Sequence, residues 1–163
     1  MYTFKFSFST LFALLISSLL SYPTWGLAQG SLQGTWKTVE IANTLPDSSW
    51  TDENPLPGLF IFGKNHYSIM HAEGNPPRKL FADDRNRTDA EMVAAYESFW
   101  ANSGTYEISG STITTRTIVA KNPNRMAENR TSEFKYKLDG NTLWLTFSWR
   151  SGGTGVYKCS RLE

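Results

Sequence analysis

The clearest pattern in this sequence is an alternation of apolar and polar positions, a period of two that is typical of half-buried β-strands. In residues 133–138, Phe134, Tyr136 and Leu138 alternate with charged side chains. After the turn residues 139–141, the next segment places four apolar side chains on one face: Leu143, Leu145, Phe147 and Trp149. The pattern predicts two antiparallel strands, each with one buried and one solvated face.

Similar patterns predict eight strands, at residues 34–41, 58–63, 66–71, 104–109, 112–119, 133–138, 142–149 and 156–161. The links after the second, fourth and sixth strands are tight turns, whereas the other links are longer. When neighbouring strands run antiparallel, every tight turn lies at one end of the sheet and every longer link at the other. Because an open sheet would keep two bare edges, the sequence predicts an all-β, eight-stranded antiparallel up-and-down barrel with a plain base and a looped mouth.

One α-helix is predicted in the long link between strands 3 and 4. Thr88 and Glu91 have the spacing of a capping box, which marks a helix N-terminus. Four apolar residues follow at helical spacing: Met92, Tyr96, Phe99 and Trp100. The segment 102–104 ends the helix, which we expect near the mouth or beside the barrel.

In a closed barrel of this order, the first and last strands pair, and both have an end at the base. Trp36 and Arg161 should therefore meet beneath the barrel floor. A guanidinium group over an indole ring contributes about 0.5–2 kcal/mol.

Residues 1–28 have the features of a secretory signal peptide. Lys5 precedes the apolar run 11–20, and the small-residue exit Gly26-Leu27-Ala28 fits cleavage after Ala28. The apolar run is shorter than the ~20 residues of a membrane-spanning helix. We expect a secreted or periplasmic protein with a mature domain at 29–163 and no stable membrane insertion.

Charge argues against a nucleic acid partner, and cysteine content argues against a disulfide. The chain has 16 basic and 15 acidic residues, and Lys5 is the only charge in 1–28, so the mature domain is balanced. A neutral domain gives no electrostatic reason to expect a nucleic acid partner. Cys159 is the only cysteine, which excludes an intrachain disulfide.

The order of several landmarks, together with Gly34-Thr35-Trp36 and Arg161, resembles the lipocalins, and nearly the whole mature chain is similar to the bacterial lipocalin-like domain family. The landmarks are the segments 32–37, 63–68, 104–108, 122–124 and 138–146. The resemblance implies an eight-stranded barrel with an extracytoplasmic, small-molecule-binding role, in which Gly34, Trp36 and Arg161 are structural. One position departs from the family pattern, because Arg125 stands where such sequences often carry an aromatic residue.

Aromatic residues carry the binding hypothesis, because the loop parity places many of them at the mouth or in the upper barrel. The expected wall consists of Met70, Tyr106, Phe134, Tyr136, Phe147, Trp149 and Tyr157, and the expected lid of Trp50, Tyr96 and Trp100. Apolar walls with a few polar groups suit a small hydrophobic guest. The competing interpretation is a barrel filled by its own side chains, because the interior of an eight-stranded barrel is just wide enough for those side chains to occupy it.

Three polar residues are candidate ligand contacts: His71, Glu107 and Arg116. The apolar alternation of 112–119 favours Arg116 in solvent. The alternative is an inward Arg116 paired with Glu107 that grips a carboxylate head group. His66 and His71 are an odd number of residues apart on one strand and face opposite ways, so we expect no metal site and no cofactor.

The leading functional hypothesis is an exported lipocalin-like protein that binds a small, mostly hydrophobic molecule in the barrel without catalysis. One alternative is a barrel-type enzyme, such as an isomerase or hydratase, with a perturbed polar group deep in the cavity. Another is a filled barrel that acts through its mouth loops as a protein-binding or inhibitor module. The sequence contains no nucleophile elbow and no catalytic Cys-His arrangement.

Overall fold

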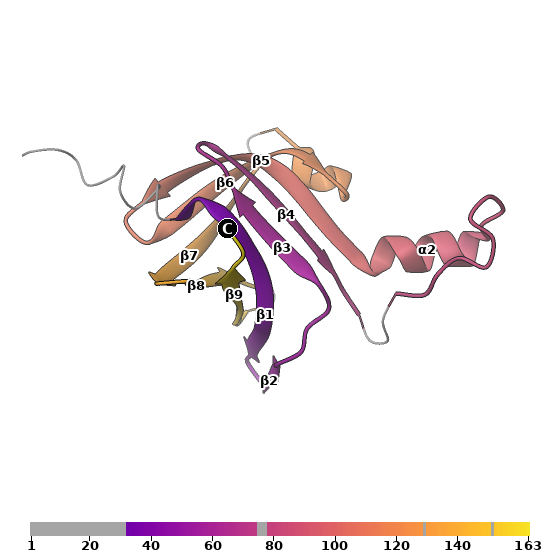
Figure 1. The fold of residues 1–163 in the computed structure, drawn as a ribbon, viewed down its shortest axis with the longest axis horizontal. Coiled ribbons are helices and arrows are strands. Elements are labelled where there is room, and N and C mark those ends of the chain that lie inside the picture. The colour runs from indigo at the N-terminus through magenta and orange to yellow at the C-terminus, as the bar shows by residue number, and fades with distance from the viewer. Residues whose placement is uncertain (1–31, 75–77, 129, 151) are drawn as a thin grey trace, which may run out of the picture.

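The computed structural model describes residues 32–74, 78–128, 130–150 and 152–163. The predicted signal peptide 1–28 lies outside these residues. The described chain forms one antiparallel sheet with a helix and a short 3-10 turn (Figure 1). The elements are β1 (Gly34–Leu45), β2 (Ser48–Asp52), β3 (Gly58–Phe62), β4 (His66–Ala72), α2 (Asp89–Glu97), β5 (Phe99–Ser109), β6 (Thr112–Ala120), η1 (Pro123–Met126), β7 (Thr131–Asp139), β8 (Thr142–Ser148) and β9 (Thr154–Arg161).

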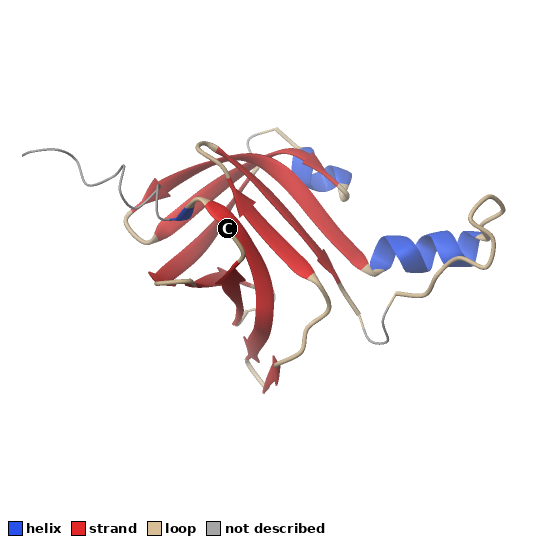
Figure 2. Ribbon diagram, in the orientation of Figure 1, coloured by secondary structure: helices blue, strands red, loops and turns tan. Residues whose placement is uncertain are grey.

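The sheet closes into a barrel, as the sequence predicted. From β3 to β9 each strand pairs with the next along the chain, and β1 pairs with both β3 and β9 (Figure 2). Trp36 lies opposite Arg161 at one end of the β1–β9 pair, and Thr44 lies opposite Thr154 at the other. The prediction of an all-β, eight-stranded antiparallel barrel is confirmed.

One strand was not predicted, and it changes the place of the helix in the strand order. β1 pairs with β3 only over Gly34–Lys37, so its mouth end has a free edge on that side. The chain turns after Leu45, and β2 covers this edge by pairing with residues 41–45. The helix therefore lies between β4 and β5, and the predicted place between strands 3 and 4 is wrong.

The helix begins where the sequence predicted and ends earlier. The Thr88 side chain accepts a hydrogen bond from the Glu91 backbone at 3.2 Å, and the Glu91 carboxylate accepts one from the Thr88 backbone at 2.9 Å. Phe99 and Trp100 belong to β5, because they pair with the end of β4. The remaining helix buries no side chain and extends away from the barrel (Figure 1).

The base of the barrel is closed by the predicted contact between Trp36 and Arg161. The Trp36 side chain is fully buried, and its Nε1 donates a hydrogen bond to the carbonyl of Leu32 at 2.9 Å. The Arg161 guanidinium lies 4.0 Å from the Trp36 ring centroid and donates a hydrogen bond to the Gln33 carbonyl at 2.7 Å. These contacts join the Trp36 ring, the Arg161 guanidinium and the backbone just before β1 where the first and last strands meet.

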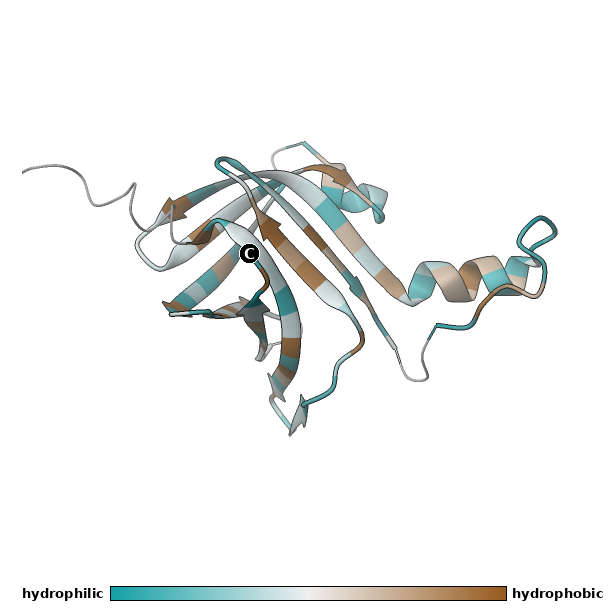
Figure 3. Ribbon diagram, viewed as in Figure 1, coloured by the Kyte–Doolittle hydropathy of each residue, from teal (hydrophilic) through white to brown (hydrophobic). Residues whose placement is uncertain are grey.

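Apolar side chains of the strands fill the lower part of the barrel. Brown and teal bands follow one another along β1, whereas β3 is brown over most of its length (Figure 3). The Tyr106 hydroxyl donates a hydrogen bond to the Gly63 carbonyl at 2.7 Å, which ties the core to a base turn. The buried apolar side chains of the strands are Trp36, Phe60, Phe62, Tyr67, Ile69, Tyr106, Ile113, Leu143, Leu145 and Cys159.

Candidate functional site

A cavity of about 440 Å³ opens at the mouth of the barrel, above this packed core. Its aromatic wall comes from β5, β7, β8, β9 and the residue that follows β8. Its charged rim comes from β7 and from the links that follow β4, β6 and β8. Six of the residues predicted to bind a ligand line this cavity: His71, Trp100, Phe134, Phe147, Trp149 and Tyr157. The sequence left open whether the barrel holds a cavity or is filled by its own side chains. Each interpretation describes one part of the barrel, because side chains fill the base and the mouth is open.

Phe147 is the centre of the aromatic wall. Its ring is stacked on Tyr157 with centroids 5.3 Å apart, and it meets Trp149 edge to face at 4.6 Å. Gly155, opposite Phe147 on β9, leaves room for this ring, because a Cβ at that position would lie 2.2 Å from it. The wall is therefore built from rings that hold one another in place.

A buried polar group lies among these rings. His71 is 5% exposed, and its ring centroid is 5.1 Å from that of Trp100. Its Nε2 lies 3.3 Å from the Tyr157 hydroxyl and 3.6 Å from Oε1 of Glu73. Burial lowers the pKa of His71 below its ordinary value, and the nearby Glu73 offsets this only in part. Burial also raises the pKa of Tyr157, so both side chains are neutral at pH 7.

The lowered pKa of His71 predicts a dependence of stability on pH. The unfolded chain binds a proton near pH 6.5, whereas the folded protein binds it only at lower pH. We therefore expect the free energy of unfolding to fall as the pH drops from about 7 to 5. Urea unfolding of the wild type and of His71→Gln at several pH values measures the effect, and H71Q should show a flatter profile. The exposed His66 supplies the control, because H66Q should keep the wild-type slope; an unchanged slope in H71Q would contradict the assignment.

Three arginines at the rim were not among the predicted site residues: Arg125, Arg130 and Arg150. Arg125 belongs to η1, and its guanidinium lies 5.2 Å from the Trp100 ring centroid. Arg130 donates a hydrogen bond to the Asn124 carbonyl at 3.0 Å. The Asn-Pro-Asn sequence at 122–124 starts this turn, and the Asn122 side chain accepts a hydrogen bond from the Asn124 backbone at 3.0 Å. Such a sequence favours a turn locally, but the position of this turn over the mouth follows only from the fold.

Two further predicted wall residues lie elsewhere in the barrel interior. Tyr106 is buried near the base, where its hydroxyl is bound to Gly63. Tyr136 is half-buried and packs against the core cluster. Neither residue lines the mouth cavity, so their predicted place in its wall is wrong.

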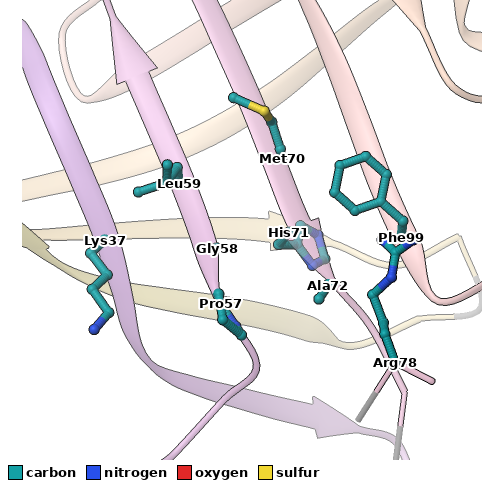
Figure 4. A pocket seen from close by; sticks show the side chains of 9 residues that line it. All are labelled: Lys37, Pro57, Gly58, Leu59, Met70, His71, Ala72, Arg78 and Phe99. Carbon is teal, nitrogen blue, oxygen red and sulfur yellow. The ribbon is translucent and has the colours of Figure 1, made fainter. Parts of the chain in front are cut away.

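Met70, Glu107 and Arg116 face the outside of the barrel. The predicted place of Met70 in the wall is therefore wrong, and so is the alternative in which Arg116 points inward with Glu107. Met70 alternates with the buried Ile69 and His71. It lines a separate outer hollow of about 390 Å³ together with Leu59 and Phe99 (Figure 4). Glu107 and Arg116 are exposed and lie opposite Thr114 and Thr105, so they do not form an inward pair. The preferred interpretation of Arg116, a side chain in solvent, is confirmed.

The predicted lid residues Trp50 and Tyr96 are exposed and do not line the mouth cavity. Trp50 lies on β2 and is 52% exposed, and Tyr96 lies on α2 and is 50% exposed. The Tyr96 hydroxyl donates a hydrogen bond to the Lys121 carbonyl at 3.4 Å. The prediction that they cover the cavity is wrong in this structure, because neither side chain is among those that line it.

Other chemistries have little support in the described part of the chain. No group of three or more His, Cys, Asp or Glu side chains is placed there to hold a metal ion. Cys159 is fully buried, and burial raises its thiol pKa to about 12, so it is a packed side chain rather than a reactive one. None of the helices in the described residues has the length and apolar character needed to cross a membrane.

Comparison with known proteins identifies the family. The lipocalin-like domain model matches residues 33–155, which is most of the chain. A redesigned β-barrel of known structure is similar at 14% identity with a TM-score of 0.42, over 83% of this chain and 96% of that one. No curated protein matches the chain significantly. The match spans the strands from β1 to β8. The chain therefore belongs to the lipocalin-like domain family.

Proposed function

We propose that this protein binds a small, mostly apolar molecule in the mouth cavity and releases it unchanged. The observation that carries the proposal is the aromatic-walled cavity of about 440 Å³ above a packed base. Cavities that hold small ligands have volumes of about 300–1,000 Å³ and mostly apolar walls with a few polar groups. The proposal includes export to the periplasm or the medium, which the pattern of 1–28 supports.

The division between base and mouth favours binding over a purely structural role. The core of the lower barrel supplies the stability, so the rings at the mouth need not be packed as tightly. The Phe147 and Tyr157 side chains keep part of their surface exposed, although both line the cavity. Burying the rest of these rings against a ligand is favourable by about 25 cal/mol for each Å² of apolar surface removed from water.

The two alternative functions, a barrel-type enzyme and a binding module that acts through its mouth loops, have fewer candidate residues in the structure than in the sequence analysis. A barrel-type enzyme required a perturbed polar group in the cavity, and of the three candidates only His71 lies there. The filled-barrel alternative assumed that side chains occupy the whole interior, whereas a cavity of about 440 Å³ opens at the mouth. In the alternative of a protein-binding or inhibitor module, the exposed Trp50 and Tyr96 are the side chains that would contact a protein partner.

Ligand binding is tested by titrating the mature protein with fatty acids, retinoids and haem while recording tryptophan emission, because Trp100 and Trp149 line the cavity. Phe147→Leu should weaken binding of any ligand found by about 3–10-fold, since it removes an aromatic contact of ~1 kcal/mol. The matched control is Phe99→Leu on the outer wall, which should leave the Kd unchanged. A flat titration with every ligand class, or equal Kd values for F147L and wild type, would reject the proposal.

A further inference from the structure

The rim of the mouth cavity carries more positive than negative side chains. Three arginines and two glutamates line it: Arg125, Arg130, Arg150, Glu73 and Glu133. Glu73 lies 3.6 Å from His71 and therefore already faces a polar group of the protein. This excess is local, because the mature chain as a whole is balanced.

Arg125 is the arginine held closest to the aromatic wall. It is half-buried, and its guanidinium lies against the Trp100 ring at 5.2 Å. In residues 32–74, 78–128, 130–150 and 152–163, no carboxylate lies within 4.0 Å of its guanidinium nitrogens. The charge of Glu73 reaches Arg125 without such a contact. Burying a guanidinium that lacks a directly paired carboxylate is costly, and a bound anion would offset that cost.

The neighbouring arginine adds to this imbalance. Burial is the main cause that lowers the pKa of Arg125, and the charge of Arg130 lowers it further, whereas the charge of Glu73 raises it. The hydrogen bond to the Asn124 carbonyl keeps Arg130 on the same turn as Arg125. Two like charges held beside one apolar cavity make a site that an anion would stabilise.

We propose that the ligand of this cavity is an organic anion: its carboxylate binds Arg125 with support from Arg130, and its flat apolar body lies against Trp100 and Phe147. The inference rests on the proposed binding function and adds the chemical class of the ligand. A guanidinium group presents parallel N–H donors that match the two oxygens of a carboxylate. The rings below it supply apolar faces at which a flat body stacks.

The test compares two probes of the same shape that differ in charge, 2-naphthoate and 2-naphthamide. Wild-type protein should bind the carboxylate about 10–100-fold more tightly than the amide, as expected for a hydrogen bond between charged groups. Arg125→Met should reduce this preference to about twofold and leave amide binding unchanged. Arg125→Lys keeps the charge but loses the paired donors, so it should show an intermediate preference.

Arg116→Met is the matched control, because it removes the same charge from the outer face of the barrel. It should keep the wild-type preference for the carboxylate. Raising the ionic strength from about 0.05 to 0.5 M should weaken binding of the carboxylate and not of the amide.

The outcomes separate the two proposals. Equal affinity of wild type for both probes, or an unchanged preference in R125M, would overturn the anion inference while leaving the cavity a binding site. A loss of preference in R116M equal to that in R125M would also overturn it, since general charge would then suffice. If neither probe binds the wild type, the anion inference fails. The binding function fails as well only if the titrations with fatty acids, retinoids and haem are also flat.

Discussion

Trp36→Ala is expected to lower the free energy of unfolding by about 3–5 kcal/mol, the range found when a buried large aromatic side chain is truncated. The Trp36 ring has no exposed surface, and it closes the floor where β1 meets β9. The substitution also removes the hydrogen bond to Leu32 and the ring beneath the Arg161 guanidinium. Urea unfolding followed by circular dichroism measures the change.

Trp144→Ala is the matched control for this prediction. Trp144 lies on the outer face of β8, is partly exposed, and has the Lys137 ammonium 5.1 Å from its ring centroid. Its truncation should cost about 1 kcal/mol, because little packed volume is lost. Similar losses for W36A and W144A would mean that barrel closure does not depend on the floor contact.

Gly104→Ala is expected to destabilise the protein by about 3 kcal/mol, because it forces two paired strands apart. Gly104 lies where the register between β5 and β6 shifts, opposite Thr117. A Cβ at this position would lie 2.0 Å from the Arg116 carbonyl oxygen and 2.9 Å from the Ile118 nitrogen. Both atoms belong to the neighbouring backbone, so no side-chain rotation relieves the clash.

The control for this prediction is Gly63→Ala in the turn between β3 and β4. A Cβ there would lie 3.5 Å from the His66 carbonyl oxygen, an ordinary van der Waals distance. G63A should change the free energy of unfolding by less than about 1 kcal/mol. An unfolding midpoint for G104A close to that of G63A would show that the β5–β6 pair tolerates a side chain at the bulge.

The candidate site could be predicted in part, and the errors have a common cause. Phe134 and Phe147 follow a clear alternation with polar neighbours, so their inward direction could be read from the sequence. β4 contains apolar residues on both faces, Ile69 on one and Met70 on the other. In such a strand the period of two does not say which face is inside.

The helix shows a second limit of local pattern. Its capping box is a contact between residues three positions apart, so Thr88 and Glu91 could be recognised directly. Its end is decided by strand pairing, because Trp100 lies opposite His71 in β5 and β4. Tertiary pairing therefore overrides the helical spacing of Phe99 and Trp100.

The sequence by itself determined the order of the eight barrel strands, the base turns, and the meeting of Trp36 with Arg161. These features depend on alternation and loop length, which are local properties of the chain. Tertiary structure alone decided that β2 covers the free edge of β1 and that η1 brings Arg125 to the mouth. Such positions arise from contacts between segments far apart in the chain, so the local alternation of apolar and polar residues does not predict them.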